Sequence, residues 1–255
     1  MTTALVTGAT AGLGAEFARQ LAARGDDLVV VARDEARLSA TRAALESQYS
    51  VKVEVLPADL STVDGCDVVA ERIVSTSAPV ETLVNNAGIG LYRPFGSTDL
   101  GIEERLLDLN VRAVLRLTHA AVGVMTRRRS GQILNVSSVA GFVPRGGNVT
   151  YSASKAWVTM FSEALAVRLA GSGVQVTVVC PGFTHTEFHD RANADMSKMP
   201  DWMWLDAAAV VAQALADARK GKPVSVPSGR YKVMISAARH VPRPLLYQLM
   251  RRRPL

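Results

Sequence analysis

Short runs of apolar, largely β-branched residues alternate with longer segments of helical spacing along most of the chain. The runs are Leu5–Thr7, Leu28–Ala32, Val51–Leu56, Thr82–Asn85, Ile133–Val136 and Val174–Val179, with a further strand expected around Pro223–Val226. The helical segments cover 13–25, 34–49, 63–77, 101–129 and 152–171. Strand–helix alternation requires right-handed crossovers, which place helices on both faces of a parallel sheet. The sequence therefore predicts a Rossmann-type, doubly wound α/β fold, with residues 1–255 as one domain.

The composition is typical of a large buried sheet, and the two cysteines indicate a reducing compartment. Hydrophobic residues make up 48% of the 255 residues and aromatic residues only 5%, so the core is expected to consist of Ala, Val and Leu. The first strand begins too early to leave room for a signal peptide, and no apolar run is long enough to span a membrane. The two cysteines, Cys66 and Cys180, lie in different segments and are expected to be buried free thiols. We expect a cytoplasmic protein.

Positive charge is concentrated at the C-terminus. Residues 1–218 hold 19 of the 29 basic residues and all 23 acidic ones, whereas residues 219–255 hold ten basic residues and no acidic one. Within residues 240–255 the apolar Leu245, Leu246, Tyr247, Leu249 and Met250 are flanked by Arg239, Arg243 and Arg251–Arg253. This tail either contacts an anionic surface, such as the inner face of the membrane, or packs on the body or on a second subunit. No nucleic-acid-reading module accompanies the basic residues, so a nucleic-acid partner is not expected.

A glycine-rich turn follows the first strand and leads into the first helical segment. Its residues are Gly8, Thr10, Ala11, Gly12, Leu13 and Gly14, with the glycines spaced Gly-x-x-x-Gly-x-Gly. Glycines permit a tight turn and close approach of the backbone to a pyrophosphate, while the N-terminus of the helix attracts the negative charge. An ordinary strand–helix turn is the alternative, but the position after the first strand favours dinucleotide binding.

The end of the second strand carries the residues that choose between dinucleotides. Arg33 ends this strand and Arg37 lies one helical turn further on. A guanidinium suits the 2′-phosphate of NADP(H), whereas an enzyme specific for NAD(H) usually places an acidic residue there. We therefore predict NADP(H), with NAD(H) as the alternative because Asp34 is also available to a ribose.

Four more motifs follow the later strands in order. They are Asn85-Asn86-Ala87-Gly88, Asn135-Val136-Ser137-Ser138, Tyr151-Ser152-Ala153-Ser154-Lys155, and Pro181-Gly182 with Thr186. Together with the glycine turn, they resemble the motifs of the classical short-chain dehydrogenase/reductase family over nearly the whole chain. The resemblance implies a hydride transfer between a nicotinamide dinucleotide and a carbonyl or alcohol.

Tyr151 and Lys155 suit that chemistry. Their four-residue spacing places both side chains on one helix face, where the ammonium is expected to lower the pKa of the phenol and favour proton transfer. Ser138 can stabilise charge on the substrate oxygen; Ser137 competes for this role, but the thirteen-residue spacing to Tyr151 favours Ser138. The family resemblance adds Asn110 as the holder of a water in the proton relay, although a mid-helix asparagine can instead face a neighbour.

The resemblance also implies further cofactor contacts. Asp59 and Leu60 are expected beside the adenine, and Lys155 is expected to bind the nicotinamide ribose. The remaining implied contacts are Asn86, Ala87, Gly88, Pro181, Gly182, Thr184 and Thr186.

Residues 183–206 interrupt the strand–helix rhythm and are rich in Met, Phe and Trp. Because they follow a strand end, we expect a substrate lid, although many of these side chains are expected simply to pack on the body. His185 and His189 have a metal-ligand spacing, but no third ligand is evident and no metal is predicted.

The functional prediction is an NADPH-dependent oxidoreductase acting on a hydrophobic, lipid-like ketone such as a 3-ketoacyl compound. Within the family, the sequence looks most like a bacterial branch of ketoacyl reductases and hydroxysteroid dehydrogenases. A homodimer or homotetramer is expected. The alternative is a non-catalytic NADP(H)-binding sensor on the same fold.

Overall fold

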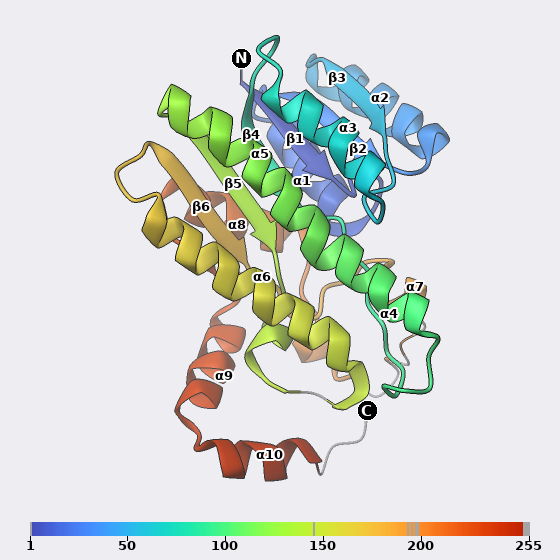
Figure 1. Cartoon of the computed structure of the whole chain (residues 1–255), viewed down its shortest axis with the longest axis vertical. Helices are drawn as coiled ribbons and strands as arrows, with labels where there is room; N and C mark the ends of the chain where they lie inside the picture. The colour runs from blue at the N-terminus through green and yellow to red at the C-terminus, as the bar shows by residue number, and fades with distance from the viewer. Residues whose placement is uncertain (1, 145, 193, 195, 197–198, 252–255) are drawn as a thin grey trace.

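The structure, a computed structural model, contains a seven-stranded parallel sheet in the order β3-β2-β1-β4-β5-β6-β7 (Figure 1). It describes residues 2–144, 146–192, 194, 196 and 199–251. The strands are β1 (Thr3–Thr7), β2 (Asp27–Ala32), β3 (Val53–Pro57), β4 (Val80–Asn85), β5 (Gly131–Val136), β6 (Val174–Val179) and β7 (Val224–Ser225). The predicted α/β fold is confirmed, including the short seventh strand.

Helices cover both faces of the sheet and create two apolar layers (Figure 1). The cluster on one face joins α1, α2 and α8 to the strands, and that on the other joins α3 and α5. The helices are α1 (Gly12–Ala22), α2 (Glu35–Tyr49), α3 (Val63–Val74), α4 (Leu100–Leu107), α5 (Ala113–Arg128), α6 (Val149–Arg168), α7 (Phe188–Arg191), α8 (Ala207–Arg219), α9 (Gly229–His240) and α10 (Arg243–Arg251). Short 3₁₀ turns cover Val139–Phe142, Gly146–Asn148 and Asp201–Met203.

The order in which the chain adds strands reverses between β1 and β4, which lie side by side and parallel. Hydrogen bonds join the ends of these two strands. The Thr7 hydroxyl accepts from the backbone N–H groups of Asn86 at 2.9 Å and Ala87 at 3.0 Å. The Asn86 side chain donates to the Thr7 carbonyl at 2.9 Å. Ligands of open α/β sheets bind at such a switch point, beyond the carboxyl ends of the strands.

The prediction of one continuous helix over residues 101–129 is wrong in one respect. A π-helical turn, η1 (Asp108–Arg112), separates α4 from α5. The turn holds Asn110, whose side chain is fully buried and bonds to the backbone of Ile89. Single π turns inside helices are frequent at functional sites, and helical periodicity alone does not reveal them.

The C-terminal helices lie at the end of the molecule beyond the carboxyl ends of the strands (Figure 1). Tyr231 of α9 is buried and donates its hydroxyl proton to the Met203 carbonyl at 2.8 Å. It also accepts from the Phe183 N–H at 3.2 Å, so α9 braces the segment expected to form the lid. Among the described residues, no helix combines the length and apolar character needed to cross a bilayer.

Candidate active site

A cavity of about 780 Å³ lies beyond the carboxyl ends of the strands. Its wall includes all of the predicted site residues except Gly14 and Asn110. These are Gly8, Thr10, Ala11, Gly12, Leu13, Arg33, Arg37, Asp59, Leu60, Asn86, Ala87, Gly88, Ser138, Tyr151, Lys155, Pro181, Gly182, Thr184 and Thr186. Segments that are far apart in the sequence thus converge on one space.

The glycine turn fits a pyrophosphate. Ala11 precedes α1 and no side chain caps the helix, so its first N–H groups stay available to an anion. Gly14 does not line the cavity, but a Cβ at this position would lie 2.1 Å from the Gly8 carbonyl oxygen. The close approach of α1 to the turn therefore requires glycine. Gly8 has φ +67°, a conformation that favours glycine. A Cβ on Gly12 would meet Thr186 at 3.1 Å, which places the segment after β6 directly over the turn.

Two arginines lie at the end of the cavity formed by β2 and α2. Arg33 is exposed and lines the wall, while Arg37 donates to the Thr10 carbonyl at 3.0 Å. Arg37 also pairs with Glu187 across the cavity mouth at 3.3 Å. Asp34 caps α2 by accepting from the Arg37 N–H at 3.0 Å, so part of its carboxylate is already engaged. The positive charge here fits a phosphate better than a ribose hydroxyl.

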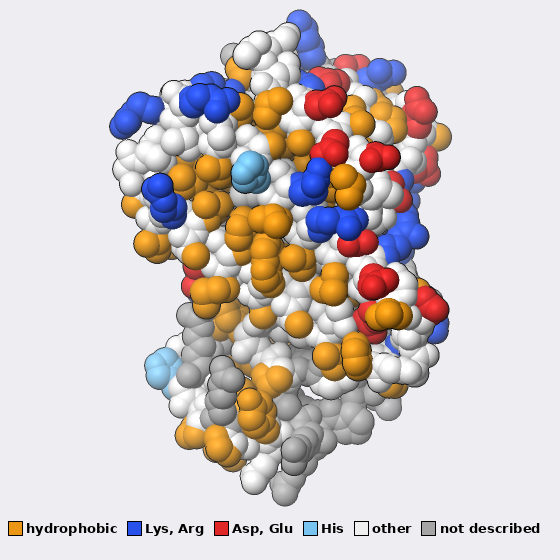
Figure 2. Space-filling view, viewed as in Figure 1, with side chains coloured by type: hydrophobic (Ala, Val, Ile, Leu, Met, Phe, Trp, Pro, Cys, Tyr) orange, Lys and Arg blue, Asp and Glu red, His pale blue; other side chains and the backbone are white. Residues whose placement is uncertain are grey.

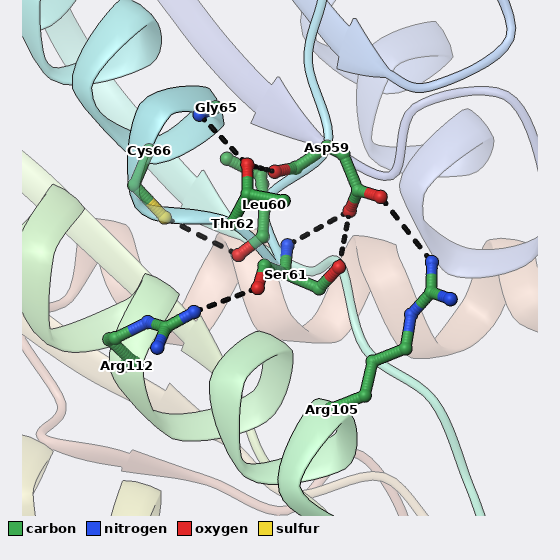
Figure 3. A network of polar contacts seen from close by, with 8 residues as sticks. All are labelled: Asp59, Leu60, Ser61, Thr62, Gly65, Cys66, Arg105 and Arg112. Atoms are coloured by element: carbon green, nitrogen blue, oxygen red, sulfur yellow. Dashed lines mark hydrogen bonds and ion pairs between the residues drawn. The ribbon is translucent and has the colours of Figure 1, made fainter. Parts of the chain in front are cut away.

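A polar network holds the loop after β3 in place (Figure 3). The Asp59 carboxylate accepts from the Ser61 N–H at 2.9 Å and hydroxyl at 2.6 Å, and it pairs with Arg105 at 3.3 Å. Burial disfavours ionisation of Asp59, but the bonds from Ser61 and the nearby Arg105 and Arg33 hold its pKa below the usual value. Asp59 and Leu60 line the wall together with Arg33.

Tyr151 of α6 is buried at the cavity wall with the Ser138 hydroxyl as a hydrogen-bond partner. Burial raises the pKa of Tyr151 well above its ordinary value; the nearby Tyr92 adds to this, and the bond to Ser138 offsets part of it. The phenol therefore carries its proton at neutral pH. Ser138 itself accepts from the Ala140 N–H at 3.1 Å, which fixes its orientation.

The expected lowering of the Tyr151 pKa by Lys155 is wrong for this structure. The Lys155 ammonium lies 5.8 Å from the centroid of the Tyr151 ring and donates to the Val136 carbonyl at 2.9 Å. Burial lowers the pKa of Lys155 to about 8, which leaves mainly a charged ammonium at neutral pH. Burial is the largest cause of the pKa shift of both side chains, an effect that helical spacing does not reveal.

Asn110 lies behind the cavity wall, whereas Ser137 lines it, and both side chains bond to neighbouring groups of the site. The Asn110 amide accepts from the Ile89 N–H at 3.0 Å and donates to the Ile89 carbonyl at 2.9 Å and to Ser154 at 3.3 Å. A Cβ on Gly88 would come within 3.0 Å of the Asn110 oxygen, so this asparagine sits directly behind the cofactor loop. The Ser137 hydroxyl donates to the Lys155 carbonyl at 2.7 Å and is buried, which favours Ser138 for the substrate.

Aromatic rings from the segment expected to form a lid line the cavity near Tyr151. Phe188 lies 5.8 Å from Tyr151 and 5.5 Å from His189, measured between ring centroids. His189 is buried and lines the cavity, whereas His185 is exposed and stacks on Trp204 at 4.6 Å. The two histidines thus have different surroundings, and no cluster of metal-ligating side chains occurs in the described part of the chain.

Sequence reasoning did not select several wall residues. Tyr92, Glu187 and Arg191 line the cavity, and Tyr92 lies 6.4 Å from Tyr151 between ring centroids. Tyr92 follows the Asn-Asn-Ala-Gly motif by a few residues in a chain poor in aromatic residues, which is the signal that was available.

Taken together, the uncapped helix at the glycine turn and the group of Ser138 with the buried Tyr151 and Lys155 define a dinucleotide-dependent oxidoreductase. Comparison with known proteins agrees. The family model of the short chain dehydrogenases matches residues 2–197, and the chain belongs to this family. It is an NAD(P)-dependent oxidoreductase that acts on a carbonyl or an alcohol.

Characterised relatives share about a third of their residues with the chain. A sulfoacetaldehyde reductase of Chromohalobacter salexigens is 34% identical over 84% of this chain and 84% of its own length. A ketoacyl reductase of Nostoc sp. is 32% identical over 88% of this chain and 77% of its own. A short-chain dehydrogenase from Sphingobium yanoikuyae, solved in complex with NADPH, is 33% identical with a TM-score of 0.86, covering 95% of this chain and 97% of that one.

Proposed function

We propose that the protein uses NADPH to reduce a hydrophobic ketone of the 3-ketoacyl kind. The observation that carries this is that Tyr151 lines one cavity together with the glycine turn and with Phe188, whose ring centroid lies 5.8 Å from that of Tyr151. Bound NADPH supplies the hydride, and the chain supplies the proton and the surroundings of the carbonyl.

Each polar residue of the catalytic group has a distinct role in this proposal. Tyr151 donates its proton to the carbonyl oxygen, consistent with a phenol whose pKa burial keeps high. Ser138 donates a hydrogen bond to the same oxygen and stabilises charge as it develops. Lys155 binds the nicotinamide ribose, and Asn110 positions the Ile89 loop and the proton relay.

Arg33 and Arg37 support NADPH over NADH. Both guanidiniums line the cavity where the second strand ends, the position at which a ribose 2′ group is bound in this fold. A 2′-phosphate gains charge-assisted hydrogen bonds there that a hydroxyl cannot match. The relative from Sphingobium yanoikuyae, which carries NADPH, supports the same choice.

The substrate class rests on the apolar character of the lid. Phe183, Phe188 and Ala192 line the cavity, and they favour a carbon chain over a small charged aldehyde. The relatives differ on this point, since one is a sulfoacetaldehyde reductase and another a ketoacyl reductase. The second agrees better with an apolar wall.

Oxidation of NADPH and NADH, measured with ketones, 3-ketoacyl thioesters and ketosteroids, tests the proposal. We expect turnover with NADPH and a 3-keto substrate, and a loss of at least about 100-fold in Tyr151→Phe with NADPH binding retained. Full turnover in Tyr151→Phe would remove the proton-donor role. A preference for NADH would contradict the role of Arg33.

A homodimer or homotetramer is part of the proposal. Exposed apolar residues follow one face of α6 at helical spacing, among them Ala153, Met160, Ala164 and Val167. Figure 2 shows hydrophobic side chains gathered in the region of α5 and α6. Such a stripe is typical of a helix that packs on a second copy. Light scattering after gel filtration tests this, and Met160→Glu is expected to lower the assembled fraction.

We also propose that the C-terminal helix contributes a weak contact with anionic membranes. Leu245 and Tyr247 of α10 are 48% and 44% exposed, in a segment with many basic residues. The side chains of Arg239, Arg243, Leu249, Met250 and Arg251 and residues 252–255 fall outside the described part. Deletion of residues 240–255 is expected to lower the fraction bound to anionic liposomes, and an unchanged fraction would contradict the contact.

A further inference from the structure

Two rings that carry polar atoms, those of Tyr92 and His189, lie among the aromatic side chains of the cavity wall. Tyr92 comes from the loop after β4 and His189 from α7, and their centroids are 6.3 Å apart. Tyr92 is also 6.4 Å from Tyr151, so the three polar rings surround one part of the cavity. A small molecule held at Tyr151 therefore reaches the other two rings.

The surroundings of His189 make it part of a built pocket. Its side chain is buried, and it packs against Phe183 at 5.6 Å and Trp204 at 5.2 Å. These apolar contacts fix the ring while it still lines the cavity. A hydrogen-bonding side chain at the cavity wall can distinguish a ligand that offers a matching polar group from one that lacks it.

The loop that carries Tyr92 is also held in place. A Cβ on Gly90 would meet the Phe188 ring at 2.9 Å and the Ala192 side chain at 3.3 Å. The loop after β4 thus lies close to residues 188–192, and the Asn110 side chain bonds to the backbone of the neighbouring Ile89. Tyr92 and His189 therefore keep their distance from Tyr151 when the lid is in this position.

We infer that Tyr92 and His189 form a second polar anchor, which selects ketones with a further carbonyl oxygen close to the reacting one. The inference rests on the proposed function and names the substrate class within it: β-dicarbonyl compounds such as 3-keto esters and thioesters. Tyr151 and Ser138 bind the ketone oxygen, and the phenol of Tyr92 and the imidazole of His189 bind the second one. The aromatic rings contact the carbon chain.

The test compares ethyl 3-oxohexanoate with 4-nonanone, which has the same chain length and ketone position but lacks the ester oxygens. The measured quantity is the ratio of kcat/KM for the two substrates with NADPH. The ester activates its ketone chemically, but this effect cancels when the ratio is compared between variants. His189→Leu and Tyr92→Phe are each expected to lower the ratio about fivefold to tenfold.

His185→Leu is the matched control. His185 belongs to the same segment and also packs on Trp204, but it is exposed and does not line the cavity. The ratio is expected to be unchanged in this variant. NADPH binding, followed by its fluorescence, checks that all variants are folded.

The outcomes separate the two proposals. An active wild-type protein whose ratio is unchanged in both His189→Leu and Tyr92→Phe overturns the anchor alone. An equal fall of the ratio in His185→Leu also overturns it, because the lid as a whole would then set the preference. No turnover of either ketone by the wild-type protein with NADPH contradicts the proposed function, and the anchor falls with it.

Discussion

The two ends of the cavity are constructed in different ways. The cofactor end is shaped by backbone: a Cβ on Gly14 would lie 2.1 Å from the Gly8 oxygen, and one on Gly8 would lie 2.9 Å from the Asn86 side chain. The substrate end is shaped by side chains such as Tyr92, from the loop after β4, and Phe188 and His189, from α7. At the glycine turn the backbone leaves no room for a Cβ, whereas the substrate end consists of side chains.

This difference explains how one fold combines a fixed cofactor with variable substrates. A backbone cradle tolerates almost no substitution, whereas side chains on loops can change without disturbing the sheet. The relatives fit this division, since they share the family while their names give different substrates. Substitutions at each end can show how far the two ends function separately.

The largest loss of activity is expected from substitution of Lys155, which lies between the cofactor end and the substrate end of the cavity. Its ammonium would lie 3.5 Å from a Cβ on Gly88, and it shares the buried face of α6 with Tyr151. Lys155→Met removes the charge that the proposal gives to the nicotinamide ribose and the proton relay. We expect kcat/KM to fall at least about 100-fold in assays with saturating NADPH. Retention of activity would mean that the ends work independently of this residue.

The same substitution is expected to stabilise the protein without cofactor at neutral pH. Burial lowers the pKa of Lys155 from 10.5 to about 8, which corresponds to on the order of 3 kcal/mol of destabilisation by the charged form. The penalty is complete below pH 8 and disappears as the pH rises toward 10.5. The stability advantage of Lys155→Met in urea unfolding should therefore shrink between pH 8 and 10.5. Loss of the bond to the Val136 carbonyl makes the measured gain smaller than this figure. A pH-independent difference would contradict the burial argument.

Gly14→Ala is expected to damage the cofactor end selectively. The added methyl group must displace the Gly8 carbonyl, so we expect a loss of about 1–3 kcal/mol in stability and a more than tenfold weaker NADPH affinity. Gly123→Ala is the matched control, since it is also helical and its Cβ would meet only the end of the Arg127 side chain, at 3.9 Å. This control should gain about 0.5–1 kcal/mol through helix propensity. Equal effects of the two substitutions in thermal unfolding and fluorescence titration would contradict the cradle.

Arg33→Ala tests the contribution of one side chain at the cofactor end, where the shape of the cavity is otherwise set mainly by backbone. We expect kcat/KM for NADPH to fall about tenfold while that for NADH stays nearly constant, because only the 2′-phosphate loses a charged partner. Steady-state assays with both dinucleotides measure this. Equal losses with NADH would show that Arg33 supports the loop rather than the phosphate.

The sequence predicted the cofactor end more completely than the substrate end, for a physical reason. Backbone constraints require particular residues at fixed spacing, so Gly8, Gly12 and Gly14 were selected from sequence and lie at the predicted turn. The substrate end depends on tertiary contacts, and Tyr92 meets Tyr151 only because the loop after β4 folds back toward α6. No local pattern encodes that meeting.

The same reasoning accounts for the errors at the centre of the site. Helical spacing placed Lys155 beside Tyr151 correctly, but it carried no information about desolvation, which dominates both pKa values. The π turn at Asn110 was hidden because apolar periodicity continues across it. Strand ends were predicted well, because apolar β-branched runs stop where the buried sheet stops.

The smallest effect is expected at the ion pair that links the two ends, Arg37 with Glu187. The Glu187 carboxylate occupies the Arg37 guanidinium, and the pair is exposed, so its contribution to stability is small. A bound 2′-phosphate competes with Glu187 for Arg37, and the carboxylate also repels it. Glu187→Gln is therefore expected to tighten NADPH binding about twofold at low salt, to leave NADH binding unchanged, and to lose its effect at high salt. Weaker binding of both dinucleotides in fluorescence titrations would instead assign Glu187 to holding the lid closed, and the two ends would then be mechanically coupled.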